Sequence, residues 1–147
     1  MAQSTETLPN GLQLLQDDRF CKLGQDSVLL SAFAKPRRNA KLLDLGCGTG
    51  ALALLVWRSD LKITGLELQD GPLDLFRQSI AANELENVTA LQGDLRQMRT
   101  LLPHGSMDYV ICNPPYFDRG AGKSAASPEK QTARQDASCT VEDVAVA

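Results

Sequence analysis

The stretch KLLDLGCGTGALALLVWRS, residues 41–59, decides the fold. It opens with a short apolar run, 41–47, of the kind that forms a buried strand. Glycines stand at positions 46, 48 and 50, and the residues from 51 to 59 have the apolar spacing of a helix. Because a strand that turns through glycines directly into a helix begins a βαβ unit, this stretch predicts an α/β domain with a mainly parallel sheet.

The same alternation continues on both sides of this stretch. Further apolar runs predict buried strands over 61–67, 107–113 and, as the weakest of the set, 88–94. Helical spacing predicts helices over 24–34, 70–83 and 94–103. Strands that alternate with helices form parallel sheets that carry helices on both faces, so we expect a three-layer sandwich.

Composition limits the classes of function. The chain has 147 residues, 43% of them hydrophobic, which suits one globular domain or part of one. Asp and Glu number 18 against 15 Lys and Arg, for a net charge of -3, so any contact with nucleic acid must be local. The densest basic stretch, 35–41, is interpreted as a solvated loop.

Cysteine usage and hydropathy indicate a soluble protein without a metal site. The four cysteines form no C-x-x-C pair and there is one histidine, so no zinc-site spacing exists. Reduced thiols of this kind suit the cytoplasm. The polar start, 1–11, lacks the pattern of a signal peptide, and no apolar run approaches the length of a membrane span.

The glycine loop predicts a ligand site. Gly46, Gly48 and Gly50 allow the backbone to turn sharply and to approach a ligand closely, although a tight structural turn would also explain them. Their G-x-G-x-G spacing departs from the dinucleotide pattern G-x-G-x-x-G, which makes a pyrophosphate cofactor less favoured.

Acidic residues at successive strand ends sharpen this prediction. Glu67 ends the second strand, where it would accept hydrogen bonds from ribose hydroxyls, and Asp94 ends the third, where it would accept from an adenine amino group. Each acid taken singly is more typical of a helix cap. Together with Asp44 they favour a cationic ligand at the carboxyl ends of the strands.

The fourth strand ends in the sequence NPPY, residues 113–116. Prolines restrict the residue before them to extended conformations, so Asn113 and Pro114 should be extended and stiff. The Asn113 side chain and the Pro114 carbonyl then offer two fixed acceptors, which suit the two N–H hydrogens of an exocyclic amine. Tyr116 would stack on a planar ring, worth about 1–3 kcal/mol. The alternative is that this sequence merely ends a strand.

Such a clamp would make a poor nucleophile reactive. The lone pair of an aromatic amine is delocalised into its ring, and hydrogen bonds from both N–H groups to Asn113 and Pro114 would favour pyramidalisation. The lone pair would then point toward an electrophile bound over the glycine loop. This is catalysis by positioning and electrostatics, and it requires no general base.

With these motifs the chain resembles the class I S-adenosylmethionine-dependent methyltransferases. DLGCGTG resembles the cofactor loop of that family, and NPPY resembles the signature of enzymes that methylate amino groups on adenine, cytosine or glutamine. The resemblance implies a Rossmann-like fold of seven strands, about four of which are visible here. It also implies that S-adenosylmethionine is held by residues of the loop and the strand ends, namely Asp44, Gly46, Gly48, Gly50, Glu67 and Asp94.

A narrower likeness is to the bacterial tRNA adenine-N6 methyltransferases that act on the anticodon loop of a valine tRNA. The opening segment 20–34 resembles that group, which implies that Asp26 borders the cofactor. The segment 130–138 resembles the group's arginine-containing helix. Lys130 and Arg134 would then contact tRNA phosphates, although solvated helix charges are the simpler interpretation of each. Pro115 and Phe117 are expected to line the substrate side of the amine clamp.

The predicted organisation is a single domain that is apparently truncated. Residues 1–34 form a lead-in segment, 41–117 the core, and 118–147 a loop followed by helices. We expect residues 1–147 to be the N-terminal, cofactor-binding part of the domain, with an exposed apolar edge at the fourth strand. The rivals to adenine N6 in tRNA are a protein glutamine side chain, a guanine amino group in rRNA, and a fragment that binds the cofactor without transferring a methyl group.

Overall fold

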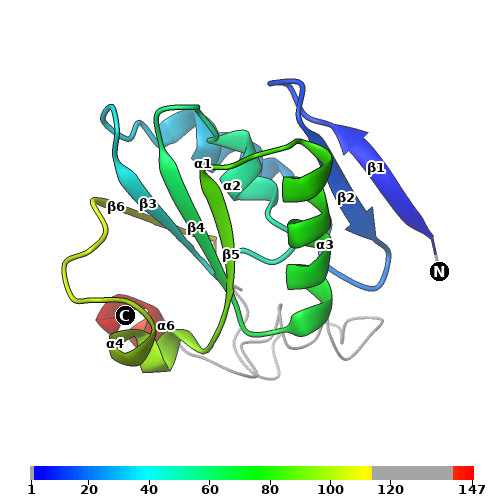
Figure 1. Ribbon diagram of the computed structural model, residues 1–147. Helices are drawn as coiled ribbons and strands as arrows, with labels where there is room; N and C mark the ends of the chain where they lie inside the picture. The colour runs from blue at the N-terminus through cyan, green and yellow to red at the C-terminus, as the bar shows by residue number, and fades with distance from the viewer. Residues whose placement is uncertain (1, 114–140) are drawn as a thin grey trace.

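A computed structural model describes residues 2–113 and 141–147, and its centre is a parallel four-stranded sheet (Figure 1). The strands follow the order β5-β4-β3-β6. Their bounds are Lys41–Leu45 for β3, Lys62–Glu67 for β4, Val88–Gln92 for β5 and Tyr109–Cys112 for β6. All three pairings are parallel, which confirms the predicted sheet and each of its strands.

Helices cover both faces of the sheet (Figure 1). The helices α1 (Gln25–Phe33), α2 (Ala51–Leu55) and α3 (Asp70–Ala82) contribute to the larger core on one face. The short helices η1 (Leu95–Gln97) and α4 (Met98–Leu101) cover the other. α6 (Val141–Val146) packs against η1. The result is the expected three-layer, Rossmann-like sandwich.

Alternation along the strands fills both layers. In β3, Leu42 belongs to the larger cluster and Leu43, its neighbour, to the smaller one, and both are buried. Because successive strand residues point to opposite faces, a strand covered on both sides must be apolar throughout. This requirement explains why the strands appear in the sequence as continuous apolar runs.

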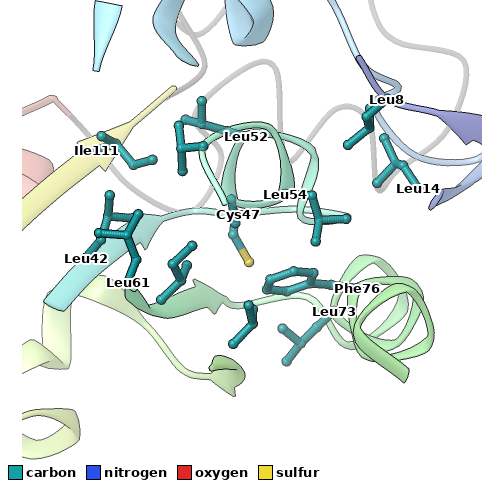
Figure 2. Close-up of a cluster of buried hydrophobic side chains, with 14 of the residues drawn as sticks. Leu8, Leu14, Leu42, Cys47, Leu52, Leu54, Leu61, Leu73, Phe76 and Ile111 are labelled. Atoms are coloured by element: carbon teal, nitrogen blue, oxygen red, sulfur yellow. The ribbon is translucent and has the colours of Figure 1, made fainter. Parts of the chain in front are cut away.

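Phe76 joins helix α3 to the glycine loop. Its ring is fully buried and lies beside Cys47 of the loop in the larger cluster (Figure 2). A Cβ added at Gly50 would lie 1.9 Å from Cδ2 of this ring, and one added at Gly65 would lie 2.5 Å from Cε1. Both glycines are therefore required so that the ring can pack directly beneath the loop.

The lead-in segment contains a hairpin that the sequence interpretation missed. β1 (Gln3–Thr7) and β2 (Gln13–Asp17) pair in antiparallel fashion, and Gly11 in their connection has a φ of 87°. β2 is fixed to helix α3, since Asn83 accepts from the Gln13 N–H and donates to the Gln13 carbonyl, at 2.8 and 2.7 Å. The Pro-Asn-Gly sequence at positions 9–11 is the signal that could have revealed it.

Two predicted helices are shorter than expected. α2 ends at Leu55, before 59, because the chain turns and the Trp57 indole N–H donates to Asn87 Oδ1 at 2.9 Å. The segment 94–103 divides into η1 and a single turn of α4. The predicted helices over 24–34 and 70–83 are confirmed within a residue or so at each end.

β6 is an edge strand within the described part of the sheet, and Val110 on it is 53% exposed. This confirms the predicted apolar edge. Among residues 2–113 and 141–147, no helix combines the length and apolar character needed to cross a bilayer. The predicted loop over 118–127 and the helix after it lie outside the described residues.

Candidate functional site

The carboxyl ends of the parallel strands bring the predicted site residues to one edge of the sheet. The glycine loop follows β3, Glu67 ends β4, Asp94 follows β5 and Asn113 follows β6. The chain moves from β3 outward to β5 and then returns to the far side of β3 at β6. Ligands of open α/β sheets bind beside such a reversal of strand order.

The glycine loop has a backbone that other residues would adopt only with strain. Gly46, Gly48 and Gly50 have φ values of 67°, 56° and 86°. Among the described residues, a Cβ at Gly46 or at Gly48 would meet nothing within 4 Å, whereas one at Gly50 would meet the core. The first two glycines thus leave room above the loop for a ligand.

Glu67 is bound to this loop. Its Oε2 accepts a hydrogen bond from the Gly48 N–H, and its Oε1 accepts one from the Gln69 N–H, both at 2.9 Å. These bonds use two of the roughly four acceptor positions of a carboxylate and fix its orientation. The residue is half-buried, and its carboxylate keeps acceptor capacity beyond these two bonds.

Asp44 lies beneath the loop and is 1% exposed. Within the described residues its Oδ2 has no hydrogen-bond partner. Burial, with a smaller contribution from the negative charge of Glu67, raises the pKa of this carboxyl to about 8. A cationic group bound at the loop would lower this pKa and favour the ionised form.

The raised pKa of Asp44 makes stability depend on pH. The folded state holds a proton that the unfolded chain releases near pH 4, so the free energy of unfolding falls as pH rises toward about 8. We expect Asp44→Asn, which cannot ionise, to gain about 2–4 kcal/mol relative to the native chain between pH 5 and pH 8. Urea denaturation at the two pH values measures this difference.

Asp17→Asn is the matched control for this prediction. Asp17 is also buried, but the bonds from Arg19 lower its pKa to about 2. The stability that it contributes is lost only below about pH 4, so the effect of this substitution should be equal at pH 5 and pH 8. An equal effect of Asp44→Asn at the two pH values would show that Asp44 is already ionised in the folded state.

Asp94 is placed next to Glu67 and is engaged with its own neighbour. Gly93 N–H donates to the Glu67 carbonyl at 3.0 Å, which aligns the two strand ends. Asp94 Oδ1 accepts from the Arg96 N–H at 2.9 Å and begins helix η1. The Arg96 side chain also bonds both carboxylate oxygens, and these bonds lower the pKa of Asp94. The helix-cap interpretation is therefore confirmed for this acid.

Asn113 is half-buried and connects β6 to the lead-in helix. Its Nδ2 donates to Ser27 Oγ at 3.3 Å, across 86 positions of sequence. Asp26 precedes Ser27 in the first turn of α1 and is exposed. The segment around Asp26 therefore does lie beside the end of β6, while the contact of Ser27 was not predicted, because no local sequence signal encodes it.

The other residues of the predicted amine clamp and the predicted RNA-contacting residues lie between positions 114 and 140. These residues lie outside the described ranges and keep the status of sequence predictions: Pro114, Pro115, Tyr116, Phe117, Lys130 and Arg134. In the described ranges, no group of three or more His, Cys, Asp or Glu side chains is arranged to hold a metal ion.

Comparison with known proteins identifies the family. The model of the methyltransferase small domain matches residues 20–132, most of the chain. The chain belongs to the methyltransferase small domain family. This membership confirms the resemblance to S-adenosylmethionine-dependent methyltransferases that the glycine loop and NPPY indicated.

Curated relatives of the chain agree with the narrower likeness. It is 37% identical over 110 residues to a protein of Shewanella sp. (strain W3-18-1), covering 71% of this chain and 46% of the relative. It is 32% identical over 130 residues to one of Aeromonas salmonicida, covering 86% and 52%. Both relatives carry the name tRNA1(Val) (adenine(37)-N6)-methyltransferase. The chain spans about half the length of these curated relatives.

Solved structures support the fold of this methyltransferase family member. The tRNA m1G37 methyltransferase of M. jannaschii matches with a TM-score of 0.61 at 20% identity, covering 78% of this chain and 36% of that one. The Pyrococcus abyssi tRNA (uracil-54, C5)-methyltransferase, solved with S-adenosyl-L-homocysteine, matches with a TM-score of 0.60 at 15% identity, covering 77% and 28%. At these identities the likeness shows the fold alone.

Proposed function

We propose that residues 1–147 form the cofactor-binding part of an enzyme that methylates an exocyclic amino group, adenine N6 in tRNA. The observation that carries the proposal is the bond from Gly48 N–H to Glu67 at the edge where Asn113 also lies. This arrangement joins the side chain expected to bind a ribose, the loop expected to bind its substituent, and the side chain expected to hold the amine. A cytoplasmic location is part of the proposal, since tRNA is the substrate.

The residues present fit S-adenosylmethionine. Glu67 would accept from the ribose hydroxyls, Asp94 would face the adenine amino group, and the open space over Gly46 and Gly48 admits the rest of the molecule. The buried Asp44 carboxyl, with one oxygen unpartnered in the described residues, would ionise at lower pH beside a positive charge and would then attract it. When bound, this cofactor supplies a methyl group activated by a sulfonium.

Asn113 would position the amine. Since its Nδ2 donates to Ser27 Oγ, the carboxamide is oriented with Oδ1 as its other, accepting end. Oδ1 and the Pro114 carbonyl would accept the two hydrogens of the amine and direct its lone pair across the site. The nitrogen loses one proton to solvent after the new bond forms, so no residue needs to act as a general base. The contribution of the chain is positioning and fixed electrostatics.

tRNA is the substrate best supported, because both relatives described above are named as tRNA adenine methyltransferases. A protein glutamine and an rRNA guanine are the rivals, since either presents an amino group that Asn113 could hold. The test uses protein expressed from its complete reading frame, labelled S-adenosylmethionine, and unmodified tRNA, rRNA and release factor. We expect label in N6-methyladenosine after nuclease digestion of the tRNA. Label only in N2-methylguanosine or in methylglutamine would overturn the choice of substrate.

Glu67→Ala should weaken cofactor binding first. The substitution removes the proposed ribose acceptors and the bond that braces Gly48, so we expect affinity for S-adenosylhomocysteine to fall at least about ten-fold, in line with the worth of charge-assisted hydrogen bonds. Isothermal titration measures it. Glu86→Ala is the control, because Glu86 is exposed just before β5, at the opposite end of the sheet. Equal affinities of the two variants would contradict the role of Glu67.

A further inference from the structure

Arg96 occupies the carboxylate that the adenine ring is expected to use. Its Nε donates to Asp94 Oδ1 and Oδ2, both at 2.9 Å, and its Nη2 donates to Oδ2 at 2.5 Å. The Arg96 backbone N–H supplies a fourth bond, to Oδ1, at 2.9 Å. Since an ionised carboxylate offers about four acceptor positions, this one neighbour fills the hydrogen-bonding capacity of Asp94.

Glu67 and Asp94 differ in how much of their hydrogen-bonding capacity is already used. Glu67 is held by two backbone N–H groups and keeps acceptor capacity toward the loop. Asp94, on the neighbouring strand end, is held by a guanidinium, which is a charged donor. A neutral aromatic amine is a weaker donor than a guanidinium, so it could bond this carboxylate only after part of the Arg96 side chain has moved away.

We propose that Arg96 competes with the adenine amino group for Asp94 and thereby lowers the affinity of the site for its cofactor. This inference rests on the proposed function, because it assigns adenine to Asp94. Arg96 would then change the affinity for the cofactor indirectly, by occupying the Asp94 carboxylate. The competition is electrostatic, so raising the salt concentration should relieve it.

The structure allows the Arg96 side chain to leave. Its side chain is 47% exposed, so much of it already lies in solvent. Asp94 is less exposed, at 18%, so the pair is partly shielded, but its guanidinium member lies at the surface, where ion pairs contribute little to stability. The cap of η1 is the hydrogen bond from the backbone N–H of Arg96 to the Asp94 carboxylate, and the guanidinium takes no part in it. The start of the helix therefore remains when the guanidinium is displaced or removed.

Arg96→Met tests the proposal, with Arg99→Met as the matched control. Methionine keeps an unbranched stem and the backbone N–H but removes the competing donor. Arg99 is exposed in the adjacent helix α4, and its replacement changes the net charge by the same amount. We expect Arg96→Met to bind S-adenosylhomocysteine about two- to five-fold more tightly than the native chain, the range for an exposed ion pair. Arg99→Met should bind like the native chain.

Two further arms distinguish competition from a general structural effect. An analogue that carries unsubstituted purine in place of adenine lacks the amino group, so Arg96→Met should give it no gain. Raising salt from about 0.05 M to about 0.5 M should strengthen binding of S-adenosylhomocysteine by the native chain and leave Arg96→Met unchanged. Isothermal titration supplies each affinity.

The outcomes separate this inference from the function on which it rests. If the native chain binds S-adenosylhomocysteine and Arg96→Met binds it equally or more weakly, competition by Arg96 is overturned and the proposed function stands. An equal gain for the purine analogue also overturns it. If none of the three chains binds the ligand, both the inference and the proposed function fail.

Discussion

Asn113→Ala is expected to abolish methyl transfer while changing affinity for S-adenosylhomocysteine by no more than a few-fold. The substitution removes one of the two acceptors that would hold the amine, and with it the bond to Ser27. Loss of such positioning should lower kcat at least about 100-fold. Single-turnover transfer by protein expressed from the complete reading frame gives the rate, and isothermal titration gives the affinity.

A matched asparagine far from this edge provides the control. Asn39 is exposed just before β3 and has a φ of 59°, so Asn39→Gly removes a carboxamide without adding strain. This variant should transfer methyl groups at the native rate. A parallel loss of kcat and cofactor affinity in Asn113→Ala would indicate damage to the whole site and would contradict the role assigned to Asn113.

Gly50→Ala is expected to have the largest effect on stability. The added Cβ would lie 1.9 Å from Cδ2 of the buried Phe76 ring, at a φ of 86° that L residues rarely adopt. Overpacking typically destabilises by about 1–3 kcal/mol and the left-handed conformation by a further 1–2 kcal/mol. We therefore expect a loss of about 2–5 kcal/mol in the free energy of unfolding, a large part of the stability of a marginally stable domain.

Gly46→Ala separates the two causes. Gly46 also has a positive φ, 67°, but its Cβ would meet no atom of residues 2–113 or 141–147 within 4 Å. This variant should lose only the roughly 1–2 kcal/mol of backbone strain. Urea denaturation followed by circular dichroism compares the variants. If both glycine substitutions lower the free energy of unfolding equally, steric contact with Phe76 is not the reason that position 50 requires glycine.

The sequence predicts the sheet because its inner strands are largely buried. In β3, Leu42 and Leu43 lie in the clusters on the two faces and are both buried, so both must be apolar. β5 and β6, at the edges of the described sheet, are more exposed but still contain short apolar runs. The hairpin of β1 and β2 was missed because β1 is exposed along its whole length, so it carries no apolar pattern. Its turn, rather than its strands, holds the detectable signal.

The site is predictable only where a motif is local. The glycine loop and the acid at the end of β4 follow from short-range patterns, and the structure joins them through Gly48 and Glu67. The bond between Ser27 and Asn113 depends on how α1 packs beside β6, which no local pattern encodes. The position of Asp94 at a strand end and its role as a helix cap follow from the sequence. The bonds from the Arg96 side chain to its carboxylate depend on side-chain geometry, so they could not be predicted.

Binding of S-adenosylhomocysteine to the 147-residue chain tests the account most directly. The ligand contains the ribose, the adenine and the amino-acid group that the loop and strand ends are proposed to hold. Titration calorimetry should show saturable binding to one site, and thermal melts should show a higher Tm with ligand present, because binding to the folded state alone stabilises it. An absence of binding heat together with an unchanged Tm would contradict the claim that these residues form a cofactor site.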